Sequence, residues 1–129
     1  MVGMVIVSHS KKIAQGVRDI VLQMASNVPV AIAGGTKDER IGTDVDSILD
    51  GINKVYSDDG VIVLFDMGSA LMNAEMAVDF LSKEKRSNVR IVDTALVEGA
   101  VTAAVEIGMG KSLMEVEQIV EEMKLGKKA

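Results

Sequence analysis

The sequence predicts an α/β fold: an open, mostly parallel sheet of about four strands with helices on both faces. Short apolar runs alternate along the chain with longer segments whose apolar residues recur at helical spacing. The short runs are almost uninterrupted, as in strands that are buried on both faces of a parallel sheet. With 129 residues and a hydrophobic fraction of 48%, the chain is long enough for a single domain, residues 1–129, with a substantial core.

The first two elements are a strand and a helix. Residues 2–7 are all apolar or glycine and predict a buried strand. The segment that follows has Ser10 available as N-cap, and Pro29 closes the unit. We expect its apolar stripe to face the core; the stripe consists of Ile13, Val17, Ile20, Val21 and Met24.

The second unit begins with a strand at residues 30–33 that ends in the turn Gly34-Gly35. A polar loop, residues 36–42, follows. Thr43 is the expected N-cap of the next helix, and the negative charge of Asp44 interacts favourably with the dipole of that helix. The apolar stripe of this helix consists of Val45, Ile48, Leu49, Ile52 and Val55.

The third unit has a strand at residues 61–65, interrupted by Asp66, and a helix that starts at Ser69. This helix carries four large apolar residues: Met72, Met76, Phe80 and Leu81. We expect the methionines at positions 72 and 76 to belong to the core. Met67 lies in the turn before the helix, and we expect it to be exposed.

The last third of the chain predicts one more strand and two helices. The charged residues 83–86 indicate a solvated turn, residues 89–92 a fourth strand, and residues 96–109 a buried helix. Ser112 and Glu115 form a capping-box pattern at the start of the final helix. We expect residues 126–129 to be frayed.

Composition excludes several classes of function. The net charge of −5 leaves no basic surface for nucleic acid. The sequence has no cysteine and one histidine, so thiolate chemistry and multi-histidine metal sites are excluded, and we expect no metal and no cofactor. An aromatic content of 2% leaves little to stack on a flavin or a base. The sequence shows no membrane span or signal peptide, so we expect a cytoplasmic protein.

The ends of the predicted strands are the place to look for a site. Ligands of open parallel sheets bind beyond the carboxyl ends of the strands, where the strand order reverses. His9 follows the first strand, the pair Gly34-Gly35 the second, and Asp66 the third. In the common doubly wound orders the first strand lies between the second and the third, so we expect these residues to meet.

A histidine beside a carboxylate suits a phosphohistidine. One imidazole nitrogen can attack phosphorus if the other carries the proton, and a carboxylate that accepts this N–H fixes the tautomer. We therefore predict that His9 is phosphorylated and that Asp66 orients its ring. The phosphoryl oxygens need donors, which helix N-termini and the glycine turn can supply without a metal. The further candidates for phosphate or partner binding are Ser8, Ser10, Gly34, Gly35, Thr43, Met67, Gly68 and Ser69.

Both residues also have ordinary structural interpretations. A lone histidine in a soluble domain is most often a surface residue or one satisfied by local hydrogen bonds. Asp66 could belong simply to a turn ahead of a helix capped by Ser69. The coincidence of the two residues at neighbouring strand ends favours the functional interpretation.

Four segments resemble the mannose-type IIA family of phosphotransferase systems, in particular its DhaM branch, the phosphotransferase subunits of bacterial dihydroxyacetone kinases. The segments are Ile6-Val7-Ser8-His9-Ser10, Ile41-Gly42-Thr43-Asp44, residues 65–75 and residues 96–100. The sugar-transport branch typically has a Gly-Ser-Pro type motif after the aspartate. No proline follows Asp66 here, which favours the dihydroxyacetone branch.

The resemblance implies a phosphoryl relay and its partners. His9 would receive the group from the phosphocarrier protein HPr and give it to ADP bound in a kinase subunit, DhaL. The resulting ATP would phosphorylate dihydroxyacetone held by a third subunit, DhaK. The family also implies a homodimer, and HPr and enzyme I would be separate proteins because residues 1–129 hold only the IIA-like domain.

Three alternatives differ in function. A IIA domain that serves a mannose-type sugar transporter or a regulated transcription factor would share the histidine. A flavodoxin-like module would need a Ser/Thr/Gly-rich phosphate loop after the first strand, where this chain has Lys11-Lys12. A receiver domain needs acidic residues at the end of that strand to hold Mg²⁺, where this chain has Ser8-His9.

Overall fold

The computed structural model describes residues 1–128, and in these the chain forms a four-stranded, all-parallel sheet in the order β2-β1-β3-β4. This confirms the predicted fold class. The elements are β1 (Gly3–Ser8), α1 (Lys11–Met24), β2 (Val30–Gly34), α2 (Val45–Val55), β3 (Val61–Phe65), α3 (Ser69–Asp79), α4 (Lys83–Arg86), β4 (Val89–Val92), α5 (Leu96–Gly108) and α6 (Leu113–Glu121). Within residues 1–128, no helix has the length and hydropathy to cross a membrane.

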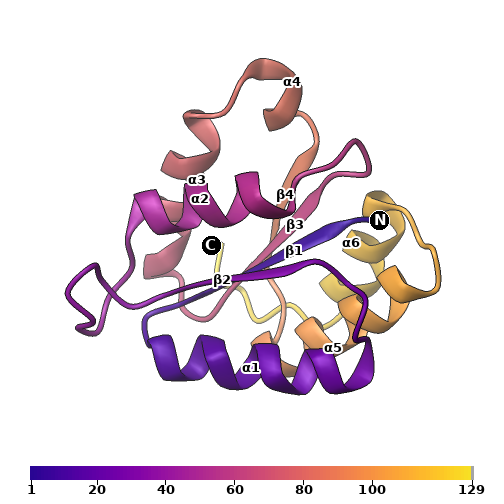
Figure 1. The fold of residues 1–129 in the computed structure, drawn as a ribbon, viewed down its shortest axis with the longest axis horizontal. Coiled ribbons are helices and arrows are strands. Elements are labelled where there is room, and N and C mark those ends of the chain that lie inside the picture. The colour runs from indigo at the N-terminus through magenta and orange to yellow at the C-terminus, as the bar shows by residue number, and fades with distance from the viewer. Residues whose placement is uncertain (129) are drawn as a thin grey trace.

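Helices cover both faces of the sheet. α1, α5 and α6 pack on one face, and α2 and α3 pack on the other (Figure 1). Along β1, Met4 and Ile6 face the first layer of helices, whereas Val5 and Val7 face the second. Because successive side chains of a strand point to opposite faces, a strand covered on both sides must be apolar throughout.

Helix α1 begins as predicted but buries a narrower face than predicted. The Ser10 hydroxyl accepts a hydrogen bond from the Ile13 N–H at 3.3 Å and caps the helix. Ile13, Ile20 and Met24 are 49%, 47% and 60% exposed, so the prediction that they face the core is wrong. The buried positions are Ala14, Val17 and Val21. Ala14 faces the core in the first turn, so the larger residues Ile13, Ile20 and Met24 lie on the solvent side of the helix.

Helix α3 shows the same effect more strongly. Met72 and Met76, which we expected in the core, are 71% and 45% exposed, and Phe80 is 68% exposed. The residues that face the sheet are Ala70, Ala74 and Ala77. Small side chains allow the helix axis to lie close to the sheet, which places the methionines on the opposite face. The exposure of Met67, at 51%, agrees with the prediction.

Smaller differences concern helix ends. Asp44, and not Thr43, caps α2, because its carboxylate accepts the Ser47 N–H at 3.0 Å. Residues 83–86 form a single exposed helical turn, α4, where a turn was predicted. The capping box of Ser112 and Glu115 is confirmed.

The C-terminal segment is bound to the sheet, so the prediction that it is frayed is wrong for residues 126–128; Ala129 lies outside the described residues. The Asp93 carboxylate, which follows β4 and is only 8% exposed, accepts the N–H groups of Leu125 and Lys127 at 3.1 and 2.7 Å. A buried carboxylate needs such donors. The sequence does not reveal that these donors come from a segment more than thirty residues away.

Candidate functional site

The site lies at the carboxyl edge of the sheet, where β1 runs between β2 and β3. Val7 pairs with Ala33 on one side and with Phe65 on the other, so the residues that follow these strands emerge side by side. The position of β1 between β2 and β3 is the one expected from the sequence. It brings the His9 side chain against Asp66, and both side chains are 15% exposed.

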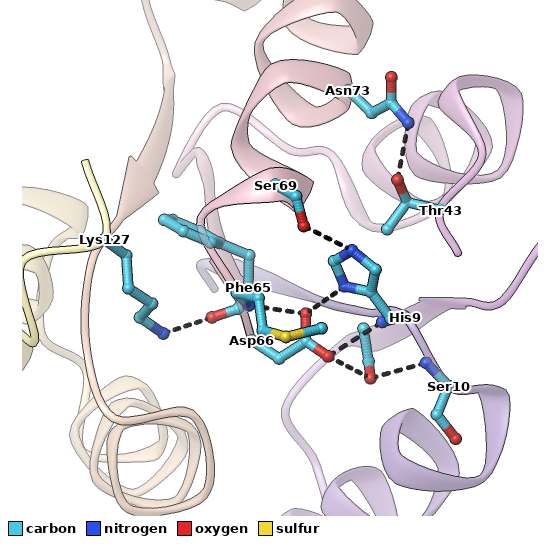
Figure 2. A network of polar contacts seen from close by, with 10 residues as sticks. His9, Ser10, Thr43, Phe65, Asp66, Ser69, Asn73 and Lys127 are labelled. Carbon is cyan, nitrogen blue, oxygen red and sulfur yellow. Dashed lines mark hydrogen bonds and ion pairs between the residues drawn. The ribbon is translucent and has the colours of Figure 1, made fainter. Parts of the chain in front are cut away.

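The Asp66 carboxylate accepts four hydrogen bonds (Figure 2). Its Oδ1 accepts from His9 Nδ1 at 2.9 Å and from the Met67 N–H at 2.8 Å. Its Oδ2 accepts from the Ser8 hydroxyl at 2.8 Å and from the His9 N–H at 2.9 Å. Burial alone would raise the pKa of Asp66, but these hydrogen bonds outweigh burial and hold the pKa below its ordinary value. The carboxylate is therefore ionised at neutral pH.

An ionised Asp66 determines the tautomer of His9. A carboxylate without a proton can only accept, so Nδ1 of the ring carries the hydrogen and Nε2 has the free lone pair. The Ser69 hydroxyl lies 2.8 Å from Nε2 and can donate to it. Ser69 is the first residue of α3 and follows the N-cap residue Gly68, so its hydroxyl contacts His9 and does not cap the helix. Nε2 of His9 thus faces the N-terminal end of α3.

Ser8 and Ser10 are used within the fold. The Ser8 side chain is fully buried, donates to Asp66 and accepts the Ser10 N–H at 3.1 Å. Ser10 caps α1 with its own hydroxyl. These groups hold Asp66 and the start of α1 in place, and both hydroxyls are engaged in hydrogen bonds within the fold.

The glycine pair after β2 also has a structural explanation. Gly35 has φ of 76°, and its N–H donates to the Ser8 carbonyl at 3.1 Å. A Cβ on Gly34 would lie 2.8 Å from the Cα of Lys11, so glycine there lets α1 approach β2. The Gly35 amide is already satisfied and is not an open donor for a phosphoryl oxygen.

A second polar contact borders the site. The Asn73 side-chain amide donates to the Thr43 hydroxyl at 2.6 Å and joins α3 to the loop before α2 (Figure 2). That loop is tied to His9 itself, because the Gly42 N–H donates to the His9 carbonyl at 2.8 Å. Asn73 was not among the predicted site residues. Its spacing of four from Ser69 places both on one face of a helix, which is the signal that could have identified it.

The turn between β3 and α3 completes the site. Met67 and Gly68 follow Asp66, and Gly68 stands at the N-cap position of α3 without a side chain to cap it. Among residues 1–128, no group of three or more histidine or carboxylate side chains is arranged to hold a metal ion.

The sequence and the fold of this chain both match known proteins. The EIIA-man family, described as the PTS system fructose IIA component, matches residues 3–117. A Listeria innocua protein named as phosphoryl donor subunit DhaM of a PEP-dependent dihydroxyacetone kinase is 38% identical over 82% of this chain and 86% of its own length. The DhaM of Escherichia coli is 39% identical over 90% of this chain, but the chain spans only 25% of that longer protein.

A solved structure matches over nearly the whole length. The crystal structure of EF1359, a protein of unknown function, matches with a TM-score of 0.84 and 29% sequence identity. The match covers 98% of this chain and 98% of that protein. Fold and sequence lead to one conclusion: the chain belongs to the EIIA-man family of phosphotransferase-system IIA components and, within it, groups with the DhaM proteins.

Proposed function

We propose that this protein is the phosphoryl-relay subunit of a phosphoenolpyruvate-dependent dihydroxyacetone kinase. His9 accepts a phosphoryl group from HPr and passes it to ADP bound in a DhaL subunit, while DhaK holds dihydroxyacetone. The arrangement of Asp66, His9 and Ser69 is the observation that carries the proposal, because it leaves one imidazole nitrogen free for attack on phosphorus. The DhaM names of the relatives support the choice of substrate.

In the first step, the lone pair of His9 Nε2 attacks the phosphorus of phosphorylated HPr. A new N–P bond forms as the bond between phosphorus and the donor nitrogen breaks, and the electron pair of that bond returns to the HPr imidazole. The His9 ring becomes cation-like, and the ionised Asp66 on Nδ1 stabilises that charge. The Ser69 hydroxyl, released from Nε2, can donate to a phosphoryl oxygen.

In the second step, a terminal oxygen of ADP attacks the same phosphorus. The Nε2–P bond breaks, its electron pair returns to the ring, and His9 is again the neutral Nδ1–H tautomer that Asp66 favours. No net proton transfer to the ring is required, which suits a histidine held against a carboxylate. The nucleotide and its ions are supplied by the partner subunit, and positioning of the two reactants accounts for most of the rate.

An apolar ridge beside the site suits the contact with a protein donor or acceptor. Met72 and Met76 of α3 and its C-cap residue Phe80 are exposed and spaced by four, and the first residue of this helix contacts His9. Flexible methionine side chains adapt to more than one partner. We infer that this ridge contributes to a transient surface that HPr and the acceptor subunit use in turn.

The choice of acceptor tests the proposed function. Protein phosphorylated at His9 and freed of donor is expected to lose its phosphoryl group, and to form dihydroxyacetone phosphate, when DhaL with bound ADP and DhaK are added. Free ADP or dihydroxyacetone alone should accept nothing at a useful rate. Transfer instead to a mannose-type transporter component would establish the sugar-transport alternative, and phosphorylation of dihydroxyacetone by the isolated chain would contradict a relay. The homodimer and the cytoplasmic location remain predictions.

A further inference from the structure

The C-terminal segment contacts the back of the turn that carries Asp66. The Lys127 ammonium donates to the Phe65 carbonyl at 2.6 Å and lies 4.9 Å from the centre of the Phe65 ring (Figure 2). Phe65 is the last residue of β3 and directly precedes Asp66. A residue near the end of the chain is therefore bonded to the peptide unit that leads into the site.

Lys127 occupies a position that a neighbouring strand would otherwise fill. β3 pairs with β1 as far as Phe65 and Val7, but its pairing with β4 ends one residue earlier, at Leu64 and Val92. The Asp66 N–H donates to Val7 of β1, and because bonding alternates along a parallel strand, the Phe65 carbonyl points toward the β4 side. A strand-end carbonyl that lacks a ladder partner needs a donor, and the Lys127 ammonium provides it.

The backbone of Lys127 is also fixed, by a hydrogen bond and by packing. Its N–H donates to Asp93 at 2.7 Å, and its carbonyl lies against Gly68. Gly68 has φ of −55°, which any residue can adopt, but a Cβ there would lie only 3.0 Å from the Lys127 oxygen. Glycine at this position therefore reflects the close approach of two backbones. The segment and the turn pack directly on each other.

The charge of Lys127 also interacts with the carboxylate of the site, Asp66. Burial lowers the pKa of Lys127, and the carboxylates of Asp93 and Asp66 offset part of this effect. A partly buried ammonium is attracted to both of these carboxylates. Its loss would remove a cation from the neighbourhood of Asp66 together with the hydrogen bond to β3.

We propose that Lys127 is a positioning residue: clamped by Asp93, it fixes the turn of residues 66–68 so that Asp66 keeps its hydrogen bond to His9 Nδ1. In this proposal Lys127 contacts neither the His9 imidazole nor the phosphoryl group. It acts through the Phe65 carbonyl on one side of Asp66 and through Gly68 on the other. The consequence for transfer rate rests on the proposed function, whereas the consequence for the His9 ring does not.

The test uses Lys127→Met, which keeps the length of the side chain and removes its charge and donors, and Lys127→Arg, which restores both. Lys124→Met is the matched control, because Lys124 is an exposed lysine of the same segment. Nitrogen-15 NMR of the imidazole reports the Nδ1–H tautomer and the exchange of its proton with water. Thermal unfolding and the rate of phosphorylation by HPr are measured on the same samples.

We expect Lys127→Met to lose the preference for the Nδ1–H tautomer, to exchange that proton faster, and to be phosphorylated on the order of 10- to 100-fold more slowly. Lys127→Arg should recover most of these properties, and Lys124→Met should resemble the unchanged protein. An Nδ1–H signal that stays intact in Lys127→Met, whether or not the melting temperature falls, would overturn the proposal. If HPr labels none of the proteins, the relay itself fails, but the NMR comparison still decides the role of Lys127.

Discussion

Replacing His9 with glutamine is expected to abolish phosphoryl incorporation while the protein still folds. The glutamine amide can donate to Asp66 much as the ring does, but it offers no nucleophilic lone pair to phosphorus. His9 is the single histidine of the sequence, so no second imidazole can take over. Intact-mass spectrometry at alkaline pH, which spares the labile N–P bond, measures the label after incubation with phosphoenolpyruvate, enzyme I and HPr.

The control for this experiment is the circular dichroism spectrum and melting temperature of the variant. The His9 side chain is only partly buried, so a large loss of stability is not expected. Label that persists in folded His9→Gln would contradict the mechanism and would direct attention to a hydroxyl such as that of Ser69.

Replacing Asp66 with asparagine is expected to slow phosphorylation of His9 by about 10³- to 10⁴-fold, as the equivalent change does when a carboxylate orients a catalytic imidazole. An asparagine can turn its NH₂ toward Nδ1, which then accepts and moves the ring proton to Nε2. The nucleophilic lone pair would be lost although the side chain keeps its shape. Single-turnover labelling by phosphorylated HPr measures the effect.

Asp66→Ala is a less clean variant than Asp66→Asn. It leaves the fully buried Ser8 hydroxyl without its acceptor, which costs about 1–3 kcal/mol of stability. Ser8→Ala is a useful comparison, because it removes one of the hydrogen bonds to Asp66 and leaves the contact with His9. Labelling of Asp66→Asn at the unchanged rate would reduce Asp66 to a residue of the turn.

The order of the strands and long helices along the chain could be predicted from the sequence because it depends on local pattern, and the position of β1 between β2 and β3 follows from the common doubly wound orders. Apolar runs such as residues 61–65 are interpretable on their own, and connections of this length between parallel strands leave few topologies. The burial of individual helix faces could not be predicted in the same way. Ala14 in α1 and Ala74 in α3 face the core, and a hydrophobicity pattern gives alanine less weight than the exposed methionines.

The site residues that directly follow strands could be predicted from the sequence. The residue that reaches the site through a contact distant in sequence could not. His9 and Asp66 both come directly after strands, so the rule for strand ends brings them together. Lys127 reaches Phe65 across 62 positions of sequence, through a segment that composition alone suggests is frayed. Its contact depends on how α5 and α6 return the chain to the sheet, which no local pattern encodes.

Phosphorus-31 NMR with nitrogen-15 labelled histidine tests most directly whether His9 carries the phosphoryl group on Nε2. The protein is phosphorylated through HPr and examined at alkaline pH, where the coupling of phosphorus to the ring nitrogen identifies the bonded atom. We predict a single phosphohistidine bonded at Nε2, because Asp66 holds the proton on Nδ1. A phosphoryl group on Nδ1, or a phosphate ester on a hydroxyl with His9 unmodified, would contradict this account.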